Sequence, residues 1–328
     1  MALSTPQILT YLSLKGIGPK AIQSLFQYSL DNSVVLTTPT DVADFINLCI
    51  SHKIISRIKE PFDLYDIQSA LSDTYTMLDR SEKLGIKVIS IADELFPTSL
   101  KSIVDSKGKS NSPVVLHIKG NSNVLNMDNA IAIIGTREPT KAGVQAGLMF
   151  SEQFAKAGFN IVSGLAIGCD TTAHQGALKV NGITTAFVAS GLDMPIYPSE
   201  NTRLAEEIVE KGGALISEYS IGEPLMANRF VERDRLQSGL SNATLAIQTG
   251  IKGGTLHAVN ATLDNGKPLY MVQYKGEEIS QEKVQGNQMY IQSGKAAPLT
   301  RDNVEDVIQS LLKKKQTSTK GNQLSLFD

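Results

Sequence analysis

The fold is decided by residues 130–178, which read AIAIIGTREPTKAGVQAGLMFSEQFAKAGFNIVSGLAIGCDTTAHQGAL. An apolar, mostly β-branched run over 131–134 ends at Gly135, as expected of a strand buried in a parallel sheet. Residues 141–157 then carry apolar side chains at helical spacing and are closed by Gly158. The stretch therefore begins with one strand–turn–helix step of an α/β fold.

The same pattern repeats immediately downstream. A second apolar run over 160–163 leads through a Gly-containing turn into a helix expected over Asp170–Leu178, with Asp170 or Thr171 as its N-cap. Because helix N-termini present unpaired N–H groups and the positive end of the helix dipole, two such turns at one sheet edge favour phosphate binding. The residues expected to bind it are Gly135, Thr136, Arg137, Ser163, Gly164 and Gly168.

Arg137 is the cation of this edge. It follows a strand-ending glycine at the start of a helix, so its guanidinium can donate two hydrogen bonds to one phosphate. The alternative is a structural salt bridge to Glu138 or Asp170.

A later segment adds further cations. Residues 228–240 are expected to form a helix that combines arginines with an aromatic ring, the pairing that binders of single strands use for phosphates and stacked bases. The alternatives are arginines paired with Glu232 or Asp234 and a phenylalanine buried in the core. The candidates are Arg229, Phe230, Arg233 and Arg235, together with Lys252, Gly253, Gly254 and Thr255 of a Gly-rich turn.

Strand-like and helix-like segments alternate as far as residue 272, which predicts a doubly wound, largely parallel sheet over 65–312. Residues 1–64 are expected to form a small helical domain. Within it, residues 15–20 (KGIGPK) join two helices and resemble a helix-hairpin-helix turn, whose amides can hold a DNA phosphate. A tight turn inside a helical bundle is the alternative. Residues 313–328 lack apolar periodicity and are expected to form a flexible tail.

Composition limits the classes of function. The formal net charge is −2, so nucleic-acid binding would have to come from a local patch. Cys49 and Cys169 are the only cysteines and have no metal-site spacing, so no metal or disulfide framework is expected. The chain shows neither a signal-peptide pattern nor an apolar run of about 18 residues, which predicts a cytoplasmic protein without membrane contact.

Several short motifs in one order resemble the DNA-processing protein A (DprA/Smf) family from about residue 12 to residue 308. They are Gly135-Thr136-Arg137, Ser163–Asp170 with His174, Ser190–Asp193 with Tyr197-Pro198, Ser217-Glu218, Phe230-x-x-Arg233-x-Arg235 with Gly239-Leu240, and Gly253-Gly254-Thr255.

This resemblance implies a helical, SAM-like N-terminal module joined to an extended Rossmann-like domain. It further implies a homodimer that binds and protects single-stranded DNA and helps to load the RecA recombinase, typically during natural transformation, without being an enzyme and without a cofactor. The chain departs from the family pattern near the presumed ligand edge. The differing residues are Val231, Asp234, Gln248 and His257-Ala258.

Two other functions fit the same sequence. Gly253-Gly254-Thr255 resembles the phosphate loop of Rossmann-like domains that sense or hydrolyse nucleotides, although no matching catalytic glutamate follows. A non-catalytic scaffold is the second alternative. His174 and Cys169 have no nucleophile–base or metal partner in the sequence, so they are expected to be structural.

The end of the chain carries a separate motif. Residues 323–327 (QLSLF) resemble the short peptide by which bacterial replication and repair proteins dock on the DNA polymerase sliding clamp. Leu324, Leu326 and Phe327 would supply apolar contacts, and Gln323 would fix the register through its amide. A chain end that packs back on the domain is the alternative.

Overall fold

The central element is one twisted sheet. The computed structural model describes residues 3–323 of the chain, and side chains as far as Lys313. Within these residues nine strands pair in the order β1-β2-β6-β5-β4-β3-β7-β8-β9. The seven from β6 to β9 run parallel, and β1 and β2 pair antiparallel at one edge. The strands are β1 (Ile86–Ser90), β2 (Val115–Gly120), β3 (Ala130–Ile134), β4 (Asn160–Ser163), β5 (Thr184–Phe187), β6 (Ala214–Ser217), β7 (Ala243–Ala246), β8 (Leu269–Val272) and β9 (Ala297–Leu299).

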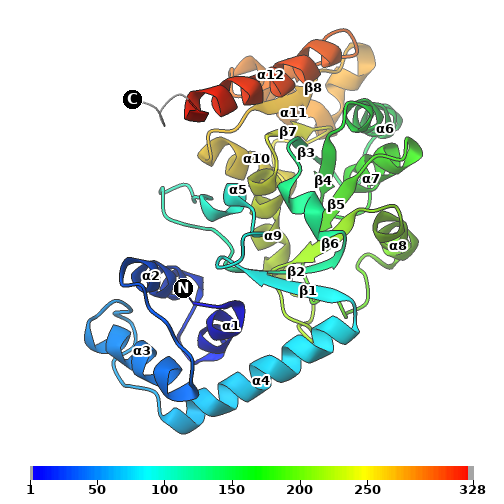
Figure 1. The fold of residues 1–328 in the computed structure, drawn as a ribbon. Helices are drawn as coiled ribbons and strands as arrows, with labels where there is room; N and C mark the ends of the chain where they lie inside the picture. The colour runs from blue at the N-terminus through cyan, green and yellow to red at the C-terminus, as the bar shows by residue number, and fades with distance from the viewer. Residues whose placement is uncertain (1–2, 324–328) are drawn as a thin grey trace.

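Helices cover both faces of this sheet (Figure 1). Along β3, Ile131 and Ile133 belong to the apolar cluster under α6, whereas Ile134 belongs to the one under α10, because successive side chains of a strand point to opposite faces. The predicted doubly wound α/β sheet is therefore confirmed. One face carries α6 (Lys141–Lys156), α7 (Cys169–Lys179), α8 (Thr202–Glu210) and α12 (Val304–Gln323), and the other α5 (Thr98–Lys101), α9 (Ala227–Leu240), α10 (Thr255–Asp264) and α11 (Gln285–Gln292).

Short 3₁₀ helices lie in the connections: η1 (Ser122–Asn126), η2 (Ser199–Asn201), η3 (Gly276–Ser280) and η4 (Glu282–Val284). Among residues 3–323, no helix combines the length and the apolar character that a membrane span needs.

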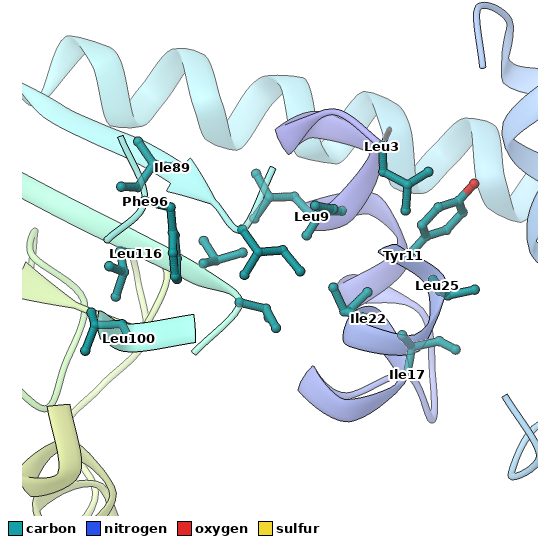
Figure 2. Close-up of a cluster of buried hydrophobic side chains, with 14 of the residues drawn as sticks. Leu3, Leu9, Tyr11, Ile17, Ile22, Leu25, Ile89, Phe96, Leu100 and Leu116 are labelled. Carbon is teal, nitrogen blue, oxygen red and sulfur yellow. The ribbon is translucent and has the colours of Figure 1, made fainter. Parts of the chain in front are cut away.

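The N-terminal helices join the edge of the sheet through the first and the fourth of them, which contact the edge strand. They are α1 (Thr5–Ser13), α2 (Pro19–Asp31), α3 (Pro39–Ser51) and the long α4 (Leu64–Lys83), which runs to β1 (Figure 1). Figure 2 shows Leu9 and Ile22 of these helices in the same apolar cluster as Ile89 of β1 and Leu100 of α5. The boundary expected at residue 64 therefore separates two parts of the chain, the first helices and the sheet domain, that share one apolar cluster.

The C-terminal helix α12 differs from the sequence expectation. It continues to Gln323, so residues 313–323 are helical where a flexible tail is expected. Apolar periodicity ends near residue 312, but the lysines and the glutamine of residues 313–316 are good helix formers. Leu324, Leu326 and Phe327 of the expected clamp-binding peptide lie outside the described residues.

Candidate nucleic-acid interface

A cleft of about 490 Å³ opens where the winding of the sheet changes direction. The chain proceeds from β3 outward to β6 on one side, and from β7 outward to β9 on the other, while β3 and β7 are neighbours. Doubly wound sheets bind their ligands at such a switch point, beside the carboxyl ends of the strands. The predicted residues that line the cleft are Gly135, Thr136, Arg137, Phe230, Arg233, Lys252, Gly253, Gly254 and Thr255.

Arg137 is the exposed cation at the mouth of this cleft. Its guanidinium lies over the ring of Phe230, 5.3 Å from the centroid, and the Phe230 ring contacts that of Tyr197 at 5.7 Å. Within the described part of the chain Arg137 forms no ion pair, and Glu138 pairs instead with Lys283 at 3.0 Å. The cation is therefore free to meet an anion from solution.

The N-terminus of α6 is already filled, which corrects the expectation of free N–H groups there. The Oε1 atom of Gln248 accepts a hydrogen bond from the N–H of Thr140 at 2.9 Å, and its Nε2 donates to the Thr140 hydroxyl at 2.9 Å. The backbone carbonyl of Gln248 also accepts from Thr136 at 2.8 Å. The side chain of Gln248 therefore fills the space at the N-terminus of α6, and its backbone carbonyl holds Thr136 beside Arg137.

No side chain caps the N-terminus of α10 among the described residues. Gly254 is its N-cap and provides no side-chain acceptor, and Gly253, Gly254 and Thr255 all line the cleft. The N–H groups of Leu256 and His257 donate to the carbonyls of Gly253 and Gly254 at 3.3 and 3.0 Å, so the amides left for an anion are those of Gly253, Gly254 and Thr255, beside the exposed Lys252.

The predicted glycines of the β4–α7 turn, Gly164 and Gly168, let the backbone of this turn pack closely against Arg233 and Arg137. A side chain at Gly164 would lie 1.5 Å from Nη1 of Arg233, and one at Gly168 would lie 2.5 Å from the carbonyl of Arg137. Gly168 also has φ +84° and is the N-cap of α7, so the predicted caps are wrong. Ser163 is fully buried and donates to the carbonyl of Ile133 at 2.6 Å.

Arg233 is a buried structural cation. It is 4% exposed, donates to the carbonyl of Phe187 at 3.0 Å and lies 3.5 Å from Asp234. Asp170 lies on its other side; burial raises the pKa of this carboxyl, and Arg233 opposes that shift. Arg233 therefore lies beneath the cleft, paired with Asp234 and with its hydrogen bond directed into the protein.

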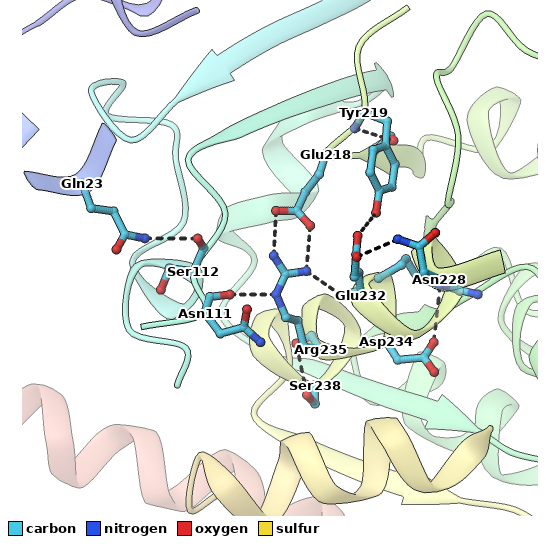
Figure 3. Close-up of polar contacts among 12 residues, drawn as sticks. Gln23, Asn111, Ser112, Glu218, Tyr219, Asn228, Glu232, Asp234, Arg235 and Ser238 are labelled. Carbon is cyan, nitrogen blue, oxygen red and sulfur yellow. Dashed lines mark hydrogen bonds and ion pairs between the residues drawn. The ribbon is translucent and has the colours of Figure 1, made fainter. Parts of the chain in front are cut away.

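Arg229 and Arg235 are not brought to the cleft. Arg229 pairs with Glu223 at 2.5 Å and stacks over Tyr219 at 4.0 Å. Figure 3 shows the guanidinium of Arg235 held by both oxygens of Glu218, at 2.7 and 2.8 Å. Neither lines the cleft among the described residues, so the structure gives both a role in positioning α9.

Three residues that sequence reasoning did not assign complete the site: Tyr197, Asp234 and Gln248. Asp234 lines the cleft, and burial raises the pKa of its carboxyl to about 6, although Arg233 and Arg137 oppose the shift. Gln248 and Asp234 could have been suspected because they depart from the family pattern, and Tyr197 because it belongs to one of the motifs.

Comparison with known proteins gives the family. The family described as DNA recombination-mediator protein A matches residues 87–312. The chain belongs to this family. The DNA processing protein DprA of Bacillus subtilis is 35% identical over 188 residues, which make up 57% of this chain and 61% of that protein, less than two thirds of its length.

Two solved structures of relatives have the same fold. The X-ray structure of DprA from Streptococcus pneumoniae matches with a TM-score of 0.71 at 24% identity, covering 93% of this chain and 97% of that one. A structure of the Helicobacter pylori protein, which concerns that protein's single-stranded DNA binding mode, matches with a TM-score of 0.59 at 27% identity. It covers 70% of this chain and 97% of the other.

The residues of this chain that invite a catalytic role are buried. His174 is fully buried, with Nδ1 2.6 Å from the hydroxyl of Thr184, and burial lowers its pKa to about 3. Burial raises the pKa of Cys169 to about 12, so the thiolate is not formed near neutral pH. Among residues 3–313, whose side chains the structure describes, no group of acidic, histidine and cysteine side chains could hold a metal ion.

A second hollow lies beside the turn between α1 and α2. Gly16 has φ +87°, Gly18 caps α2, and the hollow beside them contains the exposed cations Lys20 and Arg57. Between this hollow and the cleft lies a third, of about 660 Å³, which shares residues with each. Its acidic residues are Asp105, Glu218, Glu232 and Asp264. Arg235 lines it too and is paired with Glu218, so three further acidic side chains lie between the turn and the cleft.

Proposed function

We propose that this chain binds single-stranded DNA at the cleft between β3 and β7. The observation that carries the proposal is the Arg137 guanidinium over the Phe230 ring, which has no ion pair among the described residues and lines one cleft with Lys252 and the N-terminus of α10. A cation and helix amides suit phosphate, and an aromatic ring suits a base. None of these groups reads base edges, so little sequence preference is expected.

The wider role follows from the family. We propose that the protein protects single strands and loads RecA in recombination, as a homodimer, and that it catalyses no reaction. The buried state of His174 and Cys169 supports the last point. Docking on the sliding clamp through residues 323–327 belongs to the same proposal. In a pull-down, removing residues 323–328 should abolish clamp binding and leave DNA affinity unchanged.

A nucleotide sensor or hydrolase is the less favoured alternative. The first helix N-terminus of a Rossmann-like fold is where a nucleotide phosphate binds, and here Gln248 and Thr140 occupy it. A small ligand would have to displace a buried amide that makes two hydrogen bonds, whereas a strand can bind across the open α10 side.

The test is a fluorescence-anisotropy titration with labelled oligo-dT at several salt concentrations, with unlabelled ATP and dTMP as competitors. Arg137→Ala should weaken binding for all sequences and reduce the slope of log affinity against log salt by about one phosphate. Arg203, an exposed arginine on α8, provides the matched control variant Arg203→Ala. Equal affinity and slope for Arg137→Ala and the wild type would refute the site. Tight binding of ATP or dTMP in place of oligo-dT would favour the alternative.

A further inference from the structure

Tyr197 is an exposed aromatic ring beside the cleft. It follows β5 in the loop before η2, and 54% of its surface is exposed. Its ring centroid lies 5.7 Å from that of Phe230, with 52° between the ring planes. Phe230 also contacts Arg137, so the three side chains form one continuous cluster at the surface.

Packing inside the protein does not account for this ring. Within the described residues the Tyr197 hydroxyl forms no hydrogen bond, and more than half of the residue faces solvent. The hollow that it shares with Arg137 and Phe230 has a volume of only about 50 Å³. That is room for one or two waters of about 30 Å³ each and not for a nucleobase. A base can therefore contact Tyr197 only on the side that faces solvent.

We propose that Tyr197 is a stacking platform for a base of the single strand whose phosphate Arg137 binds. This inference rests on the proposed function and extends it, because the DNA site then reaches beyond the switch-point cleft along the end of β5. Phe230 and Tyr197 offer two adjacent rings, so successive bases can stack on them while Arg137 holds the backbone between. Tyrosine suits this role, since its two side-chain torsions lose little entropy on binding.

Stacking and phosphate binding differ in their dependence on salt. Losing one stacked base should lower affinity roughly 5- to 100-fold and leave the salt slope unchanged, because no counterion is released. Losing Arg137 should lower both the affinity and the salt slope. Salt dependence thus distinguishes a base contact at Tyr197 from a general disturbance of the phosphate site.

The experiment compares Tyr197→Ala, Tyr197→Phe and the control Tyr75→Ala, which removes a 58% exposed tyrosine from α4. Affinities for oligo-dT and for an abasic oligomer of equal length are measured over a salt series. Tyr197→Ala should bind oligo-dT roughly 5- to 100-fold more weakly with an unchanged slope, Tyr197→Phe and Tyr75→Ala should match the wild type, and the abasic oligomer should not distinguish the variants. Melting followed by circular dichroism checks that each variant is folded.

The outcomes separate the inference from the function on which it rests. If the wild type binds oligo-dT and Arg137→Ala weakens it, but folded Tyr197→Ala binds as tightly as the wild type, the stacking role is refuted and the site stands. An equal loss of affinity for the abasic oligomer would also refute it. If the wild type does not bind oligo-dT, the proposed function itself is wrong.

Discussion

Asp234 places a titratable carboxyl in the cleft that Arg137 borders. Burial raises its pKa to about 6, so the group is negative above that pH and neutral below it. A negative charge near Arg137 opposes phosphate, so DNA affinity should rise as pH falls from 7.5 to 5.5. Asp234→Asn should bind roughly three- to tenfold more tightly at pH 7.5 and lose most of this pH dependence.

The measurement is oligo-dT affinity at fixed ionic strength across that pH range. Equal pH slopes in the two proteins would contradict the role of Asp234. The raised pKa also makes the free energy of unfolding depend on pH. Because the folded state binds this proton more tightly than the unfolded state, Asp234 stabilises the fold fully below about pH 4, and this contribution is lost as the pH rises through 6.

Single residues of the site were predictable from the sequence only where they follow the end of a predicted strand. Arg137 and Lys252 follow strand ends, and parallel strands bring those ends together. The roles of Arg229 and Arg235 were not predictable, because their partners Glu223 and Glu218 lie on another loop of the fold. The same holds for Gln248, which fills a helix terminus that begins more than a hundred residues earlier.

At the scale of elements, α9 carries the cleft residues Phe230 and Arg233, and Lys267 holds its C-terminal end. The ammonium of Lys267 donates to the carbonyls of Ser238, Gly239 and Ser241 at 2.9, 2.6 and 2.8 Å. The last carbonyls of a helix have no partner inside it, so this lysine caps α9.

Lys267→Met keeps the apolar stem and removes all three donors. It should lower the free energy of unfolding by about 2–4 kcal/mol, because buried carbonyls lose bonds to a charged group. Urea denaturation measures the change, with Lys211→Met on the surface as a control that should stay within about 0.5 kcal/mol of the wild type. If Lys267→Met changed the free energy of unfolding as little as the control does, water would be replacing the three hydrogen bonds of the Lys267 ammonium.

Element prediction succeeded where a strand and helix alternate with clear apolar patterns, as in β3, α6 and β4. It failed for β9, whose three residues Ala297–Leu299 show no periodicity, and for α11, which lies between short turns. The antiparallel placement of β1 and β2 is also not encoded locally, because it depends on which edge of the sheet remains free.

At the scale of the whole molecule, the N-terminal helices and the sheet share one apolar cluster. Ile22 of α2 is fully buried in the cluster that also contains Ile89, Leu116 and Leu236. Polar contacts continue the same interface, since Gln23 donates to the carbonyl of Ser112 at 3.2 Å (Figure 3). A core that crosses the expected domain boundary couples the folding of both parts.

We therefore expect one cooperative unfolding transition for the chain rather than two. Ile22→Ala should lower the free energy of unfolding by about 2–5 kcal/mol, because it opens a cavity in the shared cluster. Calorimetry and far-ultraviolet circular dichroism should then show the whole transition moving by several degrees, with oligo-dT affinity at 20 °C unchanged. The control Val35→Ala removes a 63% exposed side chain and should not move the transition. If Ile22→Ala split off a separate low-temperature transition while the main one stayed in place, the N-terminal module would be an independent domain, and its contact with the sheet would be a docking interface between two folded units.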